Sequence, residues 1–178
     1  MRLFVGIPLP DDIRARLGGL SGGLPGARWV DPGNLHISLR FIGEVAGGDE
    51  IDIDQALQDV VGEAFEVTLA GVGCFDRRGR VHAVWAGIEK PEALIRLQGK
   101  VESAMVNSGI EPEHRKYKPH LTLARMKYGP AREVGQYLEA QNGFTAGPFT
   151  VARFTLFESH LGRGGAHYQA LADYPLGE

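Results

Sequence analysis

A four-residue pattern that occurs twice constrains the fold of this chain more than any other feature of its sequence. Each copy is a histidine, a large aliphatic residue, a small hydroxyl residue and a leucine, within a segment that alternates like a β-strand. The copies are His36-Ile37-Ser38-Leu39 and His120-Leu121-Thr122-Leu123. Because residues i and i+2 of a strand point to the same face, each copy predicts an imidazole and a hydroxyl on one face, opposite two aliphatic side chains directed into a core.

Two such strands facing one another would form a nearly symmetric cleft that contains two imidazoles and two hydroxyls. One imidazole can take a proton from an attacking water while the other gives a proton to a departing ribose oxygen, since the ordinary imidazole pKa of about 6.5 allows both forms near neutral pH. The hydroxyls of Ser38 and Thr122 can donate hydrogen bonds to phosphate oxygens as these gain charge. The pattern therefore predicts phosphodiester cleavage by His36 and His120 without a metal.

The rest of the sequence predicts a mixture of strands and helices. Strands are expected at residues 2–7, 34–42, 65–75, 80–88, 119–125, 149–158 and 166–172, and helices at about 10–20, 50–61, 91–108 and 130–141. The turn Asp76–Gly79 joins two of the strands as a hairpin. Because hairpins and helices both connect strands, we expect an α+β fold with mostly antiparallel pairing. No linker or low-complexity tract interrupts the sequence, which favours one domain over residues 1–178.

Composition limits the classes of function. The chain has 178 residues and a net charge of −3, a poor balance for gripping a long polyanion but compatible with a local basic pocket. The single cysteine, Cys74, excludes an internal disulfide, and we expect it to be half-buried in a strand. No apolar stretch approaches the roughly 18 residues needed to cross a membrane, and the N-terminus lacks the features of a cleavable signal peptide. These features predict a soluble cytoplasmic protein.

Several residues outside the repeated pattern invite a functional interpretation. By strand alternation, Arg40 lies on the face of His36, whereas Arg125 has the opposite parity to His120 and reaches a phosphate only if the strand ends or twists near Ala124. The basic stretch 115–118 could attract an anionic ligand, and Trp29 and Tyr117 could stack on an aromatic base; each has a simple structural alternative. His82, His114, His160 and His167 show no zinc-ligand spacing.

The paired motifs resemble the two signatures of the 2H phosphoesterase superfamily. Their surroundings are similar to the RNA 2′,3′-cyclic phosphodiesterase branch of that superfamily, historically called bacterial and archaeal 2′-5′ RNA ligase. The segments that carry the likeness are RLFVGIPLP, RWVDPGNLHISLRFIGEV, RVHAVWAGI, KPHLTLAR and FTLFESHL, followed by GAHYQALADYPL. They span nearly the whole chain in the expected order. Ser38 stands where this branch more often has threonine, which keeps the hydroxyl and removes a methyl group.

This resemblance implies a bilobal fold with pseudo-two-fold symmetry, in which each lobe brings one histidine strand to a central cleft. It implies hydrolysis of a 2′,3′-cyclic phosphate at an RNA 3′ end, with fragments of tRNA among the candidate substrates, to a 2′-phosphomonoester. His36 would be the proton donor and His120 the proton acceptor, while Ser38, Thr122 and Arg125 would bind the phosphate. No cofactor, metal or membrane partner is expected, and a monomer is assumed.

Two other functions remain open from the sequence. Ligation through a 2′-5′ bond is the chemical reverse of the hydrolysis and would use the same residues, with a 5′-hydroxyl in place of water. A non-catalytic module that binds RNA ends would hold the phosphate without turning it over. Because the sequence lacks a long basic run, we expect recognition of only the terminal one to three nucleotides.

Overall fold

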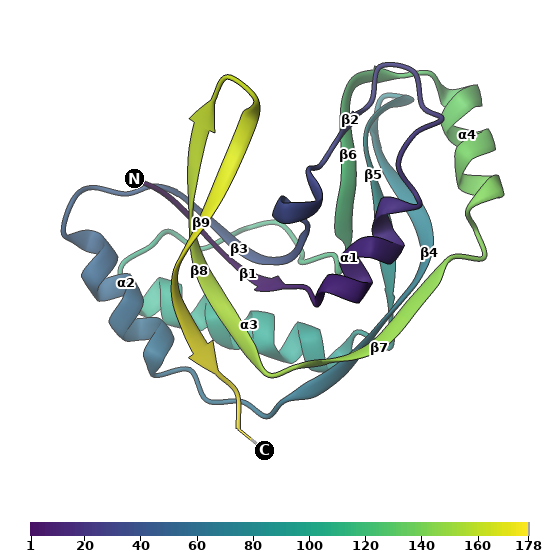
Figure 1. The fold of residues 1–178 in the computed structure, drawn as a ribbon. Coiled ribbons are helices and arrows are strands. Elements are labelled where there is room, and N and C mark those ends of the chain that lie inside the picture. Colours follow the sequence, from purple (N-terminus) through teal and green to yellow (C-terminus); the bar gives the residue numbers. More distant parts are fainter. Residues whose placement is uncertain (178) are drawn as a thin grey trace.

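The computed structural model describes residues 1–177, and over this range the strands form two antiparallel sheets (Figure 1). The first sheet has the order β3-β1-β8-β9, with bounds His36–Glu44, Arg2–Pro8, Arg153–Gly162 and Gly165–Pro175. The second has the order β2-β6-β5-β4-β7, with bounds Arg28–Trp29, Leu121–Gly129, Arg80–Glu89, Phe65–Arg77 and Thr145–Val151. One motif strand, β3 or β6, therefore belongs to each sheet.

Helices pack on both sheets. Their bounds are α1 Asp11–Gly18, α2 Asp49–Gln58, α3 Glu92–Asn107 and α4 Ala131–Ala140, and a short 3-10 helix, η1, covers Pro32–Asn34. Figure 1 shows α2 at one side of the molecule and α4 at the other. α2 and α3 pack on the first sheet, while α1 and α4 pack on the second. Since α1 follows a strand of the first sheet and α3 follows a strand of the second, the chain crosses repeatedly between lobes. The expected α+β, bilobal fold is confirmed.

Helix α3 illustrates how local sequence determines an element. Its four fully buried side chains recur at helical spacing and face the first sheet; they are Leu94, Leu97, Val101 and Met105. The helix ends where Gly109 adopts a φ of 98°. There the amide of Ile110 donates to the carbonyl of Met105 over 3.0 Å and that of Gly109 to Val106 over 3.1 Å, the paired bonds of a Schellman ending. The helix expected at 91–108 is confirmed.

The single strand expected at 149–158 is wrong. The chain forms two strands there, β7 and β8, which separate at Ala152 and belong to different sheets. Val151 pairs with Phe65 in the second sheet, whereas Arg153 pairs with Pro175 in the first. Apolar side chains stay buried on both sides of the crossing, because residues of both sheets belong to one hydrophobic core. The hydrophobic pattern therefore continues through the point at which the strand changes partners.

Each motif strand contains a bulge at the last residue of its motif. Ser38 pairs with Gly6 and Arg40 with Val5, so Leu39 has no partner of its own; Leu123 occupies the same place in the second copy, between Thr122 and Ala124. An extra residue reverses the alternation of side chains beyond it. The two bulges therefore decide which arginine reaches the cleft.

The placement of Arg40 on the face of His36 is wrong for this reason. Beyond the bulge Arg40 turns into the core side of β3, where it is only 7% exposed. Its guanidinium binds the carboxylate of Glu102 on α3 and donates to the carbonyl of Glu111. The equivalent bulge at Leu123 places Arg125 on the exposed face of β6. The strand distortion on which Arg125 depended is present.

Candidate active site

Both motif histidines are held by the same local hydrogen bond. The Nδ1 atom of His36 lies 2.7 Å from the carbonyl oxygen of Asn34, and that of His120 lies 2.5 Å from the carbonyl oxygen of Lys118. A carbonyl can only accept, so Nδ1 carries the hydrogen in each ring. In the neutral ring the opposite nitrogen, Nε2, is thereby left without a hydrogen and free to accept one. In the first lobe it lies 2.9 Å from the hydroxyl of Ser38.

Aromatic side chains fix the planes of both rings. His36 lies 4.8 Å from the ring of Phe4 and 5.4 Å from that of Tyr168, measured between centroids. His120 meets the ring of Phe75 edge-on at 4.8 Å. Sequence reasoning did not identify these aromatic residues, because each looks like an ordinary strand residue. No local signal could have identified them, because their contacts depend on strand register, which places Gly6, two residues after Phe4, opposite Ser38.

The two imidazoles share one electrostatic environment. Burial lowers the pKa of His36, and the charges of Arg125 and His120 lower it further. Burial also lowers the pKa of His120, with Arg125 and Lys118 acting in the same direction. Arg125 therefore lies close enough to act on both histidines, one from each lobe. Of the five residues expected to form the site, His36, Ser38 and Arg125 line one hollow, and the charge of His120 acts on His36 from the second lobe.

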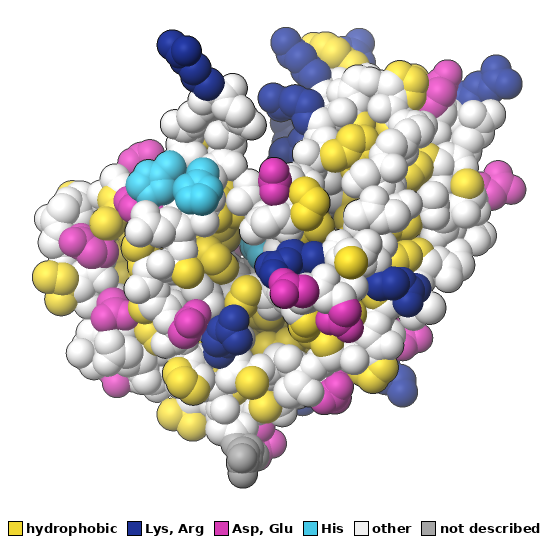
Figure 2. Space-filling view, in the orientation of Figure 1, with side chains coloured by type: hydrophobic (Ala, Val, Ile, Leu, Met, Phe, Trp, Pro, Cys, Tyr) yellow, Lys and Arg dark blue, Asp and Glu magenta, His cyan; other side chains and the backbone are white. Residues whose placement is uncertain are grey.

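A hollow of about 290 Å³ opens beside His36. Residues of both lobes line it, with Arg125 contributed by the second; the complete set is Arg2, Phe4, His36, Ser38, Phe41, Arg125, Ser159, Leu161, Ala166 and Tyr168. Figure 2 shows the surface notched at this level, between the hairpin of β8 and β9 and the lobe that carries β6. A hollow of this size approaches the lower end of the range for small-molecule sites.

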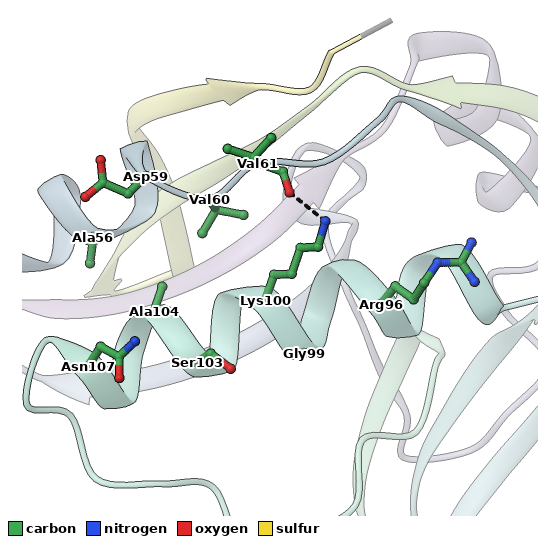
Figure 3. A pocket seen from close by; sticks show the side chains of 10 residues that line it. All are labelled: Ala56, Asp59, Val60, Val61, Arg96, Gly99, Lys100, Ser103, Ala104 and Asn107. Carbon is green, nitrogen blue, oxygen red and sulfur yellow. Dashed lines mark hydrogen bonds between the residues drawn. The ribbon is translucent and has the colours of Figure 1, made fainter.

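A larger hollow, of about 570 Å³, lies between α2 and α3 (Figure 3). Its lining is mostly small and aliphatic, with the lysine of α3 donating from Nζ to the carbonyl of Val61 over 2.6 Å; it comprises Ala56, Asp59, Val60, Val61, Arg96, Gly99, Lys100, Ser103, Ala104 and Asn107. Neither motif histidine reaches it. We therefore take the smaller hollow, which His36, Ser38 and Arg125 line, as the candidate site.

Tyr117 has a role other than the base stacking considered from the sequence. Its hydroxyl donates to the main-chain carbonyl of Ser38 over 2.7 Å, and burial raises the pKa of its phenol. Tyr117 precedes His120 by three residues, so this bond ties the approach to the second motif to the strand of the first. The side chain thus links the segment before the second motif to the strand of the first motif.

Most of the other residues considered from the sequence make packing or ion-pair contacts. Trp29 packs against the ring of Tyr137 at 5.8 Å, and His82 stacks on Phe75. The Nε2 atom of His160 lies 3.0 Å from a carboxylate oxygen of Glu158. His160 pairs with His167 across β8 and β9. Cys74 is half-buried, as expected. Over residues 1–177, no three His, Cys, Asp or Glu side chains are arranged to hold a metal ion.

Known proteins resemble the chain in sequence. A family model described as the 2′-5′ RNA ligase superfamily matches residues 9–163. A protein of Methanothermobacter thermautotrophicus named RNA 2′,3′-cyclic phosphodiesterase is 30% identical, with 99% of each chain covered. One of Escherichia coli with the same name is also 30% identical, with 98% of this chain and 96% of the relative covered.

Solved structures resemble it in fold over its full length. The structure of TT0787 of Thermus thermophilus matches with a TM-score of 0.81 and 27% identity, covering 100% of both chains. Escherichia coli LigT complexed with 3′-AMP matches with a TM-score of 0.78 and 28% identity, covering 99% of this chain and 98% of LigT. No helix within residues 1–177 has the length and apolar character to span a membrane.

Proposed function

Because the chain belongs to the 2′-5′ RNA ligase superfamily, we propose that it hydrolyses the 2′,3′-cyclic phosphate at RNA 3′ ends, those of tRNA fragments included, to a 2′-phosphomonoester. The observation that carries the proposal is the matched anchoring of two histidines, each through Nδ1 to a carbonyl two residues earlier, within reach of one arginine. The relatives in Methanothermobacter thermautotrophicus and Escherichia coli bear the name of this activity.

The reaction is an in-line displacement at phosphorus. His120 accepts a proton through Nε2 from the attacking water, whose oxygen forms the new bond to phosphorus. The bond from phosphorus to the 3′ oxygen breaks, and His36 donates its Nε2 proton to that oxygen. Ser38, Thr122 and Arg125 offer donors to the non-bridging oxygens, where negative charge increases in the transition state. Water enters and the cyclic diester becomes a monoester, so atoms and protons balance.

Binding of the anionic substrate favours the protonated form of His36, which the free site disfavours. Burial and Arg125 hold the pKa of His36 below its ordinary value, which favours the neutral ring before substrate binds. A phosphate between the two imidazoles neutralises the field of Arg125 and favours the charged form of a neighbouring imidazole. His36 can then take up the proton that it later donates, and the hydroxyl of Ser38, now bonded to Nε2 of His36, becomes available to the phosphate.

The direct test is the opening of a short RNA that ends in a 2′,3′-cyclic phosphate, in EDTA, by the wild type, His36→Ala and His120→Ala. We expect turnover in EDTA, only the 2′-phosphate as product, and a loss of about 10²–10⁴-fold in each variant. Absence of turnover in the wild type would refute the proposal. Joining of an added 5′-hydroxyl RNA in the same assay would identify ligation, the activity for which the superfamily is named.

A further inference from the structure

Arginines stand directly opposite one another at two places in the second sheet. Arg28 of β2 pairs with Arg125 of β6, and Arg77 of β4 pairs with Arg80 of β5. Side chains of paired residues share a face of the sheet, and like charges placed in this way are destabilising. Such pairs persist without penalty when an anion lies between or above them.

These cations have no carboxylate partner among residues 1–177. Ion pairs within 4.0 Å occupy arginines elsewhere in the molecule, such as Arg14, Arg40 and Arg153, but none forms at the paired positions of the second sheet. Asp76 is adjacent to Arg77 in β4, so the two side chains point to opposite faces of the strand. The repulsion is therefore not relieved within the described chain.

The cations lie on neighbouring strands between the candidate active site and the β4–β5 hairpin. The strands that carry them are neighbours, in the order β2-β6-β5-β4. We call the cations beyond the site the basic strip; its members, all exposed, are Arg28, Arg77, Arg78, Arg80 and Lys127. Arg125 marks its inner end, beside both histidines. In Figure 2, Lys and Arg side chains gather at this end of the lobe and at the tip of the β8–β9 hairpin, on either side of the notch.

Two local features shape the strip for a nucleic acid strand. The guanidinium of Arg80 lies 4.9 Å from the ring centroid of Tyr128, which is 62% exposed, so an aromatic face and a cation are presented together, as in single-strand binding surfaces. Arg78 adopts a φ of 55° at the tip of the β4–β5 hairpin, a conformation that glycine and asparagine adopt more readily. A long cation therefore stands at the outermost point of the turn.

We propose that the basic strip binds the backbone phosphates of the RNA that precede the cyclic end. The proposal rests on the proposed function, which locates the 3′ end at Arg125. Thr122 and Gly129 pair with Trp85 and Val81, which are four residues apart on β5, so this part of the sheet covers about 13 Å at ~3.3 Å per residue, or about four nucleotides of a stacked strand at 3.4 Å each. On this proposal the chain recognises more than the one to three terminal nucleotides expected from its composition. The net charge of −3 is a sum over the whole chain and does not show that cations gather in the basic strip.

The test compares substrate lengths. We would measure kcat/KM for 2′,3′-cyclic AMP and for a single-stranded 12-nucleotide RNA with a 2′,3′-cyclic phosphate, from 50 to 200 mM KCl. The test variant is Arg77→Gln/Arg78→Asn/Arg80→Gln, which retains a residue suited to the turn. A control with the same change of charge is Arg14→Gln/Arg96→Gln/Arg153→Gln, on α1, α3 and β8. Binding of the same 12-mer would be followed in parallel by fluorescence anisotropy.

The test variant should keep the wild-type kcat/KM on cyclic AMP and lose about tenfold in kcat/KM on the 12-mer at low salt. The slope of the logarithm of 12-mer affinity against the logarithm of salt concentration should decrease by about two, because three cations are removed and each phosphate contact contributes ~0.7. Equal rates on the 12-mer for wild type and test variant, or the same loss in the control, would overturn the proposal. If the wild type binds the 12-mer with the expected salt dependence but opens neither substrate, the proposed hydrolysis is refuted, whereas RNA binding by the basic strip is supported.

Discussion

Replacing Arg40 by methionine should destabilise the protein without altering the chemistry of its site. The guanidinium of Arg40 donates to the carboxylate of Glu102 at 2.5 Å and to the carbonyls of Phe41 and Glu111 at 2.7 and 2.5 Å. Its loss leaves a partly buried carboxylate that retains the amide of Glu113 at 3.0 Å. Breaking a buried pair costs 3–5 kcal/mol, and because the Glu102 side chain is 22% exposed, we expect about 3 kcal/mol.

Urea denaturation at pH 7 measures this cost directly, as a lower midpoint with an unchanged m-value. The melting temperature should fall by about 6–12 °C, at 2–4 °C per kcal/mol for a chain of this length. The double variant Arg40→Met/Glu102→Leu should recover most of the loss, because it leaves no unpaired carboxylate. A loss below 1 kcal/mol together with a large fall in kcat would refute the reasoning, since that result belongs to an arginine in the cleft.

Three further perturbations probe the site and its supports, and a fourth variant, Gly135→Ala, serves as a control. Burial and Arg125 lower the pKa of both histidines, so each ring loses its proton at a lower pH than an ordinary imidazole. The transitions in the pH dependence of kcat/KM should therefore occur at lower pH than those of ordinary imidazoles. In Arg125→Gln these transitions should move to higher pH. Tyr117→Phe removes the bond to the Ser38 carbonyl; it should cost about 1 kcal/mol of unfolding free energy and lower kcat several-fold with little change in KM, whereas equal kcat would exclude a positioning role. Gly73→Ala places a Cβ within 2.3 Å of the Trp85 ring, which packs beside His120, and should lower kcat and stability together; Gly135→Ala, which meets nothing within 4 Å, should instead stabilise by about 0.5–1 kcal/mol.

The sequence was most informative where local pattern and tertiary structure agree. The hairpin of β4 and β5 and the long helix α3 were expected from their periodicity and turn residues, and both are confirmed. The α+β class followed from the order of the elements. Both motifs were identifiable because each combines four residue types within one strand. The roles of His36 and His120 remain proposals, which the assays above test.

Features that depend on strand pairing could not be predicted in this way. A bulge such as that at Leu39 is decided by the neighbouring strand, so alternation alone gave the wrong face for Arg40. The change of sheet at Ala152 leaves no trace in the hydrophobic pattern, and the two-residue strand β2 is too short to show one. The basic strip was missed because cations distant in sequence become neighbours only through the strand order.

The central claim is that histidines from the two lobes act as one acid–base unit. The most direct measurement is the single-turnover rate of cyclic phosphate opening for His36→Ala, His120→Ala and the double variant, in EDTA and at fixed pH. Groups that act as a unit are strongly non-additive, so the account predicts that the double variant is about as slow as either single variant. Losses that multiply in the double variant, or a single variant with a near wild-type rate, would contradict it.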